Sequence, residues 1–325
     1  MTLTQDHFSL NTLQWITVSL GESTGEPGSV GWEFDRPSFL ARQPEVLRQV
    51  RDAGFSAVML EVLPTQTLQA YARVVADSGL RVTPGYVHIG LPEEFGRDHA
   101  GDDEARFRWF DGIRRRAEES QYMGLDRVFL AADMAPGRPR IDEAAARGHA
   151  FDAARLDRVT DIIGEAAEVL KAEGVTAALH NHVGTWIETV AEYDHVLDAV
   201  PSTILAAGPD LGHLAWTGVD VVAWVARHAD RISDLHIKDM DLALAAEARE
   251  KGTPYFDVMA QRFFLEPGLG DVPLEAALAA LPDGFDGSIL VEVDKPSMEP
   301  FASARASWAW IAENYPSAAG TEEAA

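Results

Sequence analysis

Short apolar segments alternate with longer amphipathic segments along the chain. The apolar segments are rich in β-branched and aromatic residues and lie at 13–19, 55–62, 80–87, 127–132, 175–180, 203–208, 232–238 and 288–293. The amphipathic segments lie at 38–53, 65–78, 103–123, 151–173, 187–199, 218–229, 273–281 and 300–314. Short apolar runs are typical of buried strands, and the longer segments have the length and period of helices. The pattern therefore predicts eight strands, each followed by a helix.

The fourth amphipathic segment shows the helical period most clearly. Leu156, Val159 and Ile163 are followed, at the same three- and four-residue steps, by Ala166 and Leu170. On a helix these positions form one apolar stripe. Regular alternation of strands and helices favours parallel pairing with right-handed crossovers, and eight such units close into a barrel. An open doubly wound sheet is the alternative, but the first predicted strand is not followed by a glycine-rich dinucleotide-binding turn.

We therefore expect a single α/β domain, a (β/α)8 or TIM barrel, over residues 1–316. Three segments that follow predicted strands are too long for simple connections: 20–37, 88–101 and 240–267. They belong on the C-terminal face of the barrel, where the active sites of this fold lie. The segment 240–267 is expected to be an insertion. Residues 317–325 have the composition of a disordered tail.

The charge of the chain narrows the classes of ligand. It has 27 basic and 52 acidic residues, which give a formal net charge of −25. That charge argues against binding nucleic acid or an anionic membrane surface, because both depend on lysine and arginine. Cysteine is absent, so a metal ion would need oxygen and imidazole ligands. The sequence shows neither a signal peptide nor an apolar run of the roughly 18 residues that suggest a membrane helix, so we expect a cytoplasmic protein.

Charged and imidazole side chains gather where the predicted strands end. They are Glu61, His88, Asp133, His180, His182, Glu188, Asp210, His213, His236, Lys238, Asp239, Glu292 and Asp294. In a barrel of parallel strands these ends converge on one mouth. Charge within an apolar strand, such as Glu292 in ILVEV, is costly unless it is paired or binds a metal. Each residue alone is explained as well by a hydrogen-bonded core position, but the whole set predicts a divalent-metal site.

Five motifs occur in order in the second half of the chain. They are HNHVGTWIET at 180–189, PDLGHLAWTGVD at 209–220, LHIKDMD at 235–241, EPGLGDVPLEAAL at 266–278 and ILVEVDKP at 289–296. The set resembles the xylose-isomerase-like TIM barrels, a superfamily of sugar phosphate isomerases and epimerases, and is most similar to its inosose dehydratase branch. The resemblance covers about residues 170–300, whereas the first half shares only the rhythm of strands and helices.

The resemblance implies one divalent metal ion held by Glu, Asp, His and Glu side chains. Matched by motif, Asp210, His236 and Glu292 take three of these places. Glu188 is the expected fourth ligand, with His182 or a water molecule as the alternative. Mn²⁺ is the first choice of metal, and Mg²⁺, Co²⁺ and Zn²⁺ are the alternatives.

Further side chains are expected to contact the substrate. They are Glu61, His88, His180, Trp186 and His213. Of these, Glu61 and His213 match positions that bind substrate in the superfamily, and the aromatic face of Trp186 suits the C–H surface of a sugar.

A metal ion at such a mouth acts as a Lewis acid on a carbonyl group and stabilises the enolate that forms when an α-proton leaves. The base must lie within hydrogen-bond reach of that carbon, and His182, Glu188 and Lys238 are the candidates. Loss of a β-substituent from the enolate is an elimination, whereas return of the proton elsewhere is an isomerisation or epimerisation. We expect a metal-dependent lyase acting on a keto-inositol or a 3-keto-sugar.

Several alternatives stay open. One is a sugar isomerase or epimerase. Another is a lyase that cleaves C- or O-glycosides of 3-keto-sugars. Whatever the reaction, the chain could form a homo-oligomer or a complex with a small β-rich subunit. A third, of a different class, is a sugar-binding barrel without catalysis. Apurinic endonucleases share the superfamily fold, but the negative charge disfavours a DNA substrate.

Overall fold

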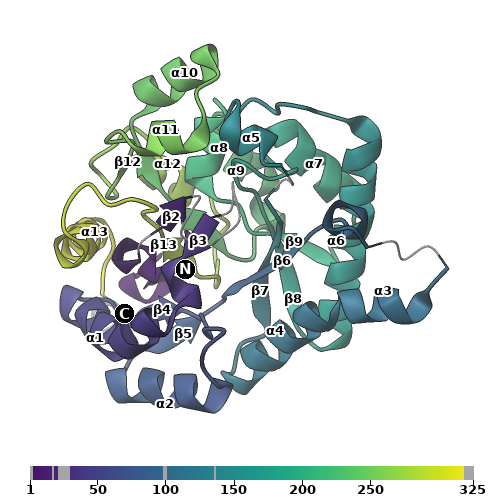
Figure 1. Ribbon diagram of the computed structural model, residues 1–325. Coiled ribbons are helices and arrows are strands. Elements are labelled where there is room, and N and C mark those ends of the chain that lie inside the picture. The colour runs from purple at the N-terminus through teal and green to yellow at the C-terminus, as the bar shows by residue number, and fades with distance from the viewer. Residues whose placement is uncertain (1–2, 17, 21–29, 98–100, 135–136, 318–325) are drawn as a thin grey trace.

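A ring of short parallel strands forms the centre of the protein (Figure 1). The computed structural model describes residues 3–16, 18–20, 30–97, 101–134 and 137–317. The barrel strands are β1 (Phe8–Leu10), β4 (Ala57–Met59), β5 (Arg81–Thr83) with β6 (Tyr86–Ile89), β7 (Arg127–Ala132), β8 (Thr176–His180), β9 (Leu205–Ala207), β10 (Leu235–Ile237) and β13 (Ile289–Val291). The ladders between them are all parallel.

Two continuous ladders make up most of the ring. One has the order β10–β13–β1–β4–β5 and the other the order β6–β7–β8–β9. They meet in the third barrel strand, where Pro84 and Gly85 separate β5 from β6, since proline has no N–H to donate to a ladder. Between β9 and β10 the ring is completed by two isolated parallel bridges, Ala207↔Ile232 and Asp210↔His236. The second bridge brings Asp210 beside His236.

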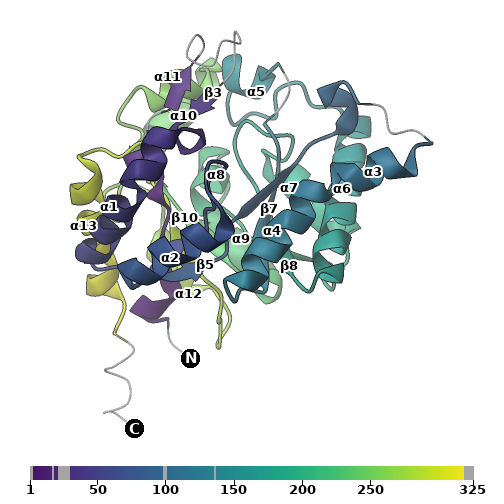
Figure 2. The same cartoon turned by 60° about the horizontal axis from the view of Figure 1, so that its bottom comes forward.

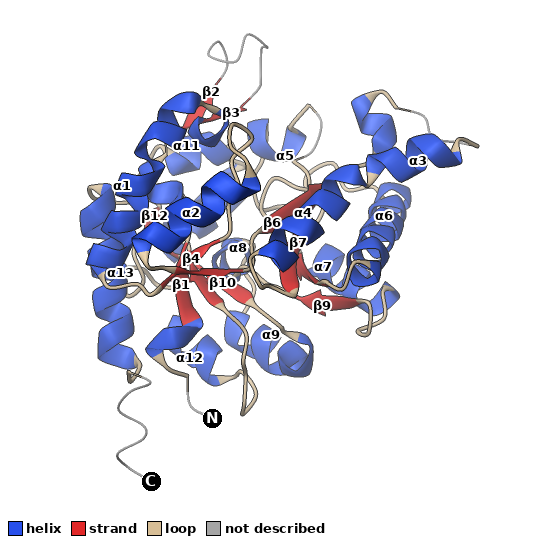
Figure 3. Ribbon diagram, turned by 90° about the horizontal axis from the view of Figure 1, so that it is seen from below, coloured by secondary structure: helices blue, strands red, loops and turns tan. Residues whose placement is uncertain are grey.

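An outer layer of helices surrounds the strands (Figures 2 and 3). It consists of α1 (Pro37–Ala53), α2 (Leu68–Ser78), α3 (Asp103–Trp109), α4 (Asp111–Tyr122), α6 (Ala153–Ala172), α7 (Val190–Ala199), α9 (Val221–His228), α12 (Leu274–Ala279) and α13 (Pro300–Asn314). Helix α6 buries its predicted stripe, from Leu156 through Ile163 to Leu170. The predicted helix at 103–123 is two helices, α3 and α4, that meet at Phe110. The 3-10 helices are η1 (Gln5–His7), η2 (Thr12–Trp15), η4 (Glu33–Asp35), η5 (Pro92–Phe95) and η6 (Ala229–Arg231).

The first barrel strand lies earlier in the chain than the pattern predicts. The expected strand at 13–19 contains most of η2 and the start of β2 (Val18–Leu20), which pairs antiparallel with β3 (Val30–Trp32). The barrel strand is instead β1, which pairs with β13 and β4. The three residues of β1 are buried, so they form a short apolar run with no alternation to mark it as a strand. The other seven predicted strands each overlap a strand of the barrel.

Elements outside the barrel repeat collect at its mouth. Figure 2 shows β3, α5 (Pro139–Asp142), α10 (Leu242–Lys251) and α11 (Tyr255–Met259) together at the top. The predicted insertion at 240–267 begins and ends in the antiparallel pair β11 (Asp239–Met240) and β12 (Phe264–Leu265). In the sequence, α10 and α11 come between these two strands.

The carboxylate of Asp239 fixes this insertion to the end of β10. It accepts hydrogen bonds from the backbone N–H groups of Met240, Gly268 and Gly270, each at 2.9 Å, and from that of Val272 at 3.0 Å. At Gly270 a Cβ atom would lie 2.3 Å from the Asp239 carboxylate, so only glycine fits without a shift. The insertion therefore starts and ends at one rigid point of the barrel mouth.

Four predicted segments fall partly outside the described residues. They are the strand at 13–19, the long segments at 20–37 and 88–101, and the tail at 317–325, of which residues 17, 21–29, 98–100 and 318–325 are not described. Among the helices that the structure does describe, none has the length and hydrophobicity that crossing a membrane requires.

Candidate metal centre and active-site cavity

Four buried side chains from the last four barrel strands converge at the mouth. His180 ends β8, Asp210 follows β9, His236 lies in the middle of β10, and Glu292 follows β13. Asp210 is also the N-cap of the short helix α8 (Leu211–Trp216), and its Oδ1 accepts a hydrogen bond from the backbone N–H of His213 at 2.9 Å. That bond leaves the other carboxylate oxygen to face the barrel axis.

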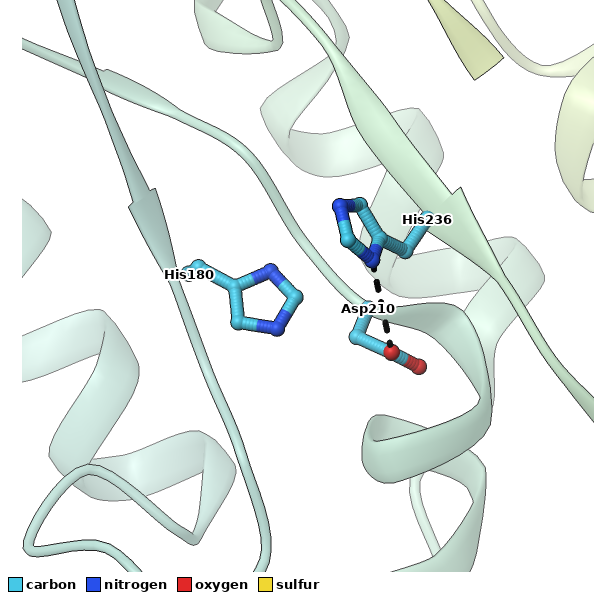
Figure 4. Close-up of side chains that lie close together, drawn as sticks. All are labelled: His180, Asp210 and His236. Atoms are coloured by element: carbon cyan, nitrogen blue, oxygen red, sulfur yellow. Dashed lines mark ion pairs between the residues drawn. The ribbon is translucent and has the colours of Figure 1, made fainter. Parts of the chain in front are cut away.

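The donor atoms of His180, Asp210 and His236 lie within 4.8 Å of one another. Figure 4 shows the imidazole of His236 directed at the Asp210 carboxylate, with His180 beside them. The His236 Nδ1 atom is 4.0 Å from Asp210 Oδ2 and 2.7 Å from Glu292 Oε2. Oδ2 of Asp210 is buried and makes no hydrogen bond among the described residues, although it forms an ion pair with the Lys238 ammonium nitrogen at 3.3 Å. A buried carboxylate oxygen beside an imidazole has the chemistry of a metal ligand.

Tyr86, in β6, completes the inner side of this group. Its hydroxyl oxygen is 2.8 Å from His180 Nε2 and 3.1 Å from His236 Nδ1. Nδ1 of His180 lies 3.2 Å from the carbonyl oxygen of Gly208, which can only accept, so Nδ1 carries the proton. Nε2 of His180 therefore presents a lone pair, as a metal ligand must.

These residues fit a divalent metal ion. Two imidazoles and two carboxylates form a mixed nitrogen and oxygen donor set without sulfur, which suits first-row divalent ions such as Zn²⁺, Co²⁺ and Mn²⁺. The structure thus brings together the expected ligands Asp210, His236 and Glu292. Beside them lies His180, which was expected to contact substrate, whereas Glu188 does not lie in this group.

The charges at this group are strongly coupled. Burial raises the pKa of Asp210, although the Lys238 ammonium and His236 oppose the shift. Burial also tends to raise the pKa of Glu292. The Lys238 ammonium and the hydrogen bond from His236 outweigh this effect of burial and hold the pKa of Glu292 well below its usual range. Glu292 is therefore an anion even though it is buried.

The source of that effect, Lys238, is itself fully buried behind the group. Its ammonium nitrogen lies 2.7 Å from Asp294 Oδ1, 3.2 Å from Glu292 Oε1 and 3.3 Å from Asp210 Oδ2. It is also 3.0 Å from Nε2 of His213. Burial disfavours the ammonium form, but the three carboxylates prevail and raise the pKa of Lys238 well above its usual value. Lys238 is therefore a fixed positive charge and not a free amine.

A cavity of about 500 Å³ opens at the mouth in front of the group. Its polar lining consists of Asn11, Glu61, Tyr86, His88, Arg116, His180, His182, Thr185, Tyr255, Glu292 and Asp294. Its apolar lining includes Leu13, Phe34, Met59, Met134, Phe256 and Met259. Pockets of this volume hold small-molecule ligands. The cavity therefore offers polar side chains suited to hydroxyl groups as well as apolar side chains.

His182 presents a lone pair to this cavity. Its Nδ1 lies 2.7 Å from the carbonyl oxygen of Val183 and so carries the ring proton, which leaves Nε2 unprotonated. Burial and the nearby Lys238 charge lower the pKa of His182 to about 3. The imidazole is consequently neutral at physiological pH, with an unprotonated Nε2.

Glu188, expected as a ligand or a base, lies elsewhere. Its Oε1 accepts hydrogen bonds from the backbone N–H groups of Ala146 and Gly184, both at 3.0 Å, and its Oε2 accepts one from Gly148 at 2.7 Å. The structure does not bring its carboxylate to Asp210, and Glu188 does not line the cavity. The side chain instead ties the loop before α6 to the loop after β8.

Replacing Glu188 by glutamine should leave metal binding unchanged and lower the free energy of unfolding by about 1.5–3 kcal/mol, since the amide cannot accept the bond from Gly148. Thermal denaturation and metal analysis of the same sample measure both quantities. Glu165→Gln, at a surface ion pair with Arg106, is the control and should change stability by less than about 0.5 kcal/mol. Loss of metal without loss of stability would return Glu188 to the list of ligands.

The expected substrate-binding residues divide into two groups. Glu61, His88 and His180 line the cavity. Trp186 does not: its indole N–H donates to Glu94 at 3.0 Å, and its ring lies between the guanidinium groups of two arginines. His213 does not line it either, because it packs behind His182 and is bonded to Lys238.

Sequence reasoning assigned no role to the cavity-lining residues Asp294 and Tyr86, and it considered Tyr255 only as one of the insertion's aromatic residues, for binding an aryl aglycone or a partner. Asp294 was recognised as a strand end, but its contact with Lys238 follows only from the packing of the two side chains. Tyr255 reaches the site from the insertion and donates a hydrogen bond to Asp294 Oδ2 at 3.2 Å. Tyr86 lies just after the Pro84–Gly85 break, which interrupts the alternation that would have marked it as inward-facing.

Comparison with known proteins adds to this geometry. The family described as xylose isomerase-like TIM barrel matches residues 47–314. Rhizopine catabolism protein MocC of Rhizobium meliloti is 29% identical over 310 residues, which cover 89% of this chain and 84% of that protein. Inosose dehydratase of Geobacillus thermodenitrificans is 26% identical over 146 residues, 45% of this chain and 49% of that protein. The alignment with this dehydratase thus spans about half of its length.

Solved structures share the architecture at low sequence identity. An L-ribulose 3-epimerase has a TM-score of 0.61 at 19% identity, covering 97% of this chain and 96% of that one. The IOLI protein with a zinc atom has a TM-score of 0.60 at 14% identity, covering 95% and 99%. A xylose isomerase-like TIM barrel protein from Mycobacterium smegmatis in complex with magnesium has a TM-score of 0.59 at 17% identity, covering 94% of each chain. These likenesses confirm the predicted barrel fold.

Proposed function

The chain belongs to the xylose isomerase-like TIM barrel family, and on that basis we propose that it is a metal-dependent lyase acting on a keto-inositol or a 3-keto-sugar. One observation carries the proposal: the metal-ligand set of His180, Asp210, His236 and Glu292 meets beside a cavity to which His182 presents a lone pair. The relatives named inosose dehydratase support elimination from a cyclic polyol ketone.

The proposed ligands His180, Asp210, His236 and Glu292 would hold one divalent ion. Mn²⁺ remains our first choice, and the two imidazoles make Zn²⁺ and Co²⁺ better alternatives than Mg²⁺. The zinc and magnesium in related structures support a divalent ion in this family without selecting one. When bound, such an ion supplies a Lewis acid that polarises the carbonyl group of the substrate.

His182 is the proposed base. Its Nε2 removes the proton from the carbon next to the carbonyl group, and the C–H electron pair passes into an enolate. The enolate then forms a C=C bond by expelling a β-hydroxyl group. The proton on Nε2 is transferred to that departing oxygen, so that water leaves and His182 is neutral again.

Glu61 and His88 orient the substrate. They come from the ends of the second and third barrel strands and line the cavity together with His182. A carboxylate that accepts hydrogen bonds and an imidazole that can donate one suit the hydroxyl groups of a polyol. Holding these hydroxyl groups fixes which C–H bond faces Nε2 of His182.

Two alternatives share the same enolate. The likeness to an L-ribulose 3-epimerase supports a sugar isomerase or epimerase. The apolar lining residues Met134, Phe256 and Met259 support cleavage of a 3-keto-glycoside whose aglycone contacts them. A sugar-binding barrel without catalysis needs neither the metal ligands nor the lone pair of His182.

Incubation in D₂O with Mn²⁺ and a panel of keto-inositols and 3-keto-glycosides tests the proposal. We expect deuterium uptake at the carbon next to the carbonyl group, together with an unsaturated product, and both should stop when a chelator removes the metal. Deuterium exchange without an unsaturated product would mean that the protein is a sugar isomerase or epimerase and not a lyase. Binding without exchange for every compound would leave only the sugar-binding barrel.

A further inference from the structure

The buried ammonium group of Lys238 lies where a second metal ion would be expected. Four acceptor atoms surround its nitrogen within 3.3 Å: three carboxylate oxygens, from Asp294, Glu292 and Asp210, and Nε2 of His213. An ammonium group has only three protons. The shell therefore has more acceptors than Lys238 can satisfy, and an excess of oxygen and imidazole acceptors is characteristic of a metal shell.

A second set of donor atoms supports this interpretation. Those of His182, His213 and Asp294 lie within 4.8 Å of one another, and none of these residues belongs to the first set. Since an ammonium group can only donate, Nε2 of His213 must present a lone pair to Lys238. Nδ1 of His213 then carries the ring proton, and it is buried with no partner among the described residues.

The two sets share their carboxylates. Asp210 and Glu292 each contact both His236, in the first set, and Lys238. Together with Asp294 they can carry three negative charges, which one divalent ion and one ammonium group neutralise. A second divalent ion in addition to Lys238 would leave a large net positive charge in a buried site, which is costly.

We propose that the Lys238 ammonium group permanently occupies the second of two adjacent cation positions, so that the protein holds one divalent ion where its side chains could otherwise hold two. Lys238 is then a positioning residue. It does not line the cavity, and it acts by holding Asp210 and Glu292 toward the first ion. The inference rests on the proposed function only for that first ion.

Removal of the ammonium group tests the inference directly. Wild-type protein and Lys238→Ala are dialysed against Mn²⁺, and the metal bound per chain is measured by elemental analysis. We expect one ion in the wild type and two in Lys238→Ala, where the shortened side chain leaves both the space and the charge for the second ion. Lys238→Arg keeps the charge and should hold one. Lys295→Ala, at an exposed lysine in the loop that follows β13, should also hold one.

Chemical rescue gives a readout that a merely structural role would not move. Propylammonium has the atoms that Lys238→Ala lacks, so adding it should displace the second Mn²⁺ and return the content to one ion. Adding His213→Ala to Lys238→Ala should also remove the second ion. If Lys238→Ala unfolds on its own, propylammonium is present during purification and is then dialysed away against Mn²⁺.

The outcomes separate this inference from the proposed function. One ion in both wild type and Lys238→Ala overturns the inference and leaves the metal-dependent lyase intact. No ion in the wild type and one in Lys238→Ala supports the role of Lys238 and overturns the metal-dependent function. No ion in either protein overturns both.

Discussion

Replacing Glu292 by glutamine is expected to abolish metal binding and to lower kcat/KM by at least about a thousandfold. Glutamine has the shape of glutamate but is neutral, so it is a weaker ligand for the ion. In the wild type Oε2 of Glu292 lies 2.7 Å from Nδ1 of His236, and the amide of glutamine can place an N–H donor there instead of an acceptor. Loss of a Lewis acid removes several kcal/mol of transition-state stabilisation, and about 4 kcal/mol corresponds to that thousandfold change. Elemental analysis and steady-state kinetics measure the two effects.

The comparison needs a second ligand and a neutral control. His236→Ala should give the same two losses, since it removes an imidazole from the same set. Glu275→Gln is the control. Glu275 is exposed on α12, accepts a hydrogen bond from the indole of Trp310 at 3.0 Å, and belongs neither to the proposed ligands nor to the cavity lining. Full metal content in both Glu292→Gln and His236→Ala would contradict the proposed centre, whatever the activity.

Replacing His182 by alanine is expected to lower kcat by about 10²–10⁴-fold, which is the contribution typical of a general base. The metal content should stay at that of the wild type, because His182 is not among the four proposed ligands. Deuterium exchange next to the carbonyl group should fall by the same factor as kcat, since both require removal of that proton. Exchange measured by NMR and elemental analysis of one preparation test the three statements together.

This variant also decides between the two roles that the sequence left open for His182. Loss of metal would make it a ligand, the alternative raised beside Glu188. Retention of metal with undiminished exchange would mean that another group removes the proton. His195→Ala, at an exposed histidine paired with Asp157, serves as the control and should behave as the wild type.

The architecture could be predicted from the sequence because buried parallel strands and amphipathic helices leave strong periodic signals. The stripe from Leu156 to Leu170 is an example, and α6 follows it closely. The prediction was wrong at β1, because its three buried residues are too few to show a periodic pattern. The longer apolar run at 13–19 was therefore predicted as the first strand instead. Periodicity also did not show the turn at Phe110, where α3, which buries none of its residues, ends and α4 begins.

The site could be predicted only where topology alone determines position. Asp210, His236 and Glu292 follow from the rule that parallel strand ends converge, and the structure brings them together. Glu188 has an equally suitable chemistry, but its direction depends on three backbone N–H groups of two loops, which no sequence pattern marks. The position of Lys238 among three carboxylates likewise depends on packing between strands.

The insertion that Asp239 fixes to the end of β10 adds apolar side chains to a cavity whose polar groups lie mostly on the barrel. The proposed ligands and His182 lie on the barrel strands or directly after them, whereas Phe256 and Met259 reach the cavity from α11, inside the insertion. Because its two ends meet at one carboxylate, this segment can vary in length and composition with little effect on the barrel beneath it. Descendants of this chain could therefore acquire new substrates by mutation within a single exchangeable module while they inherit the reaction unchanged.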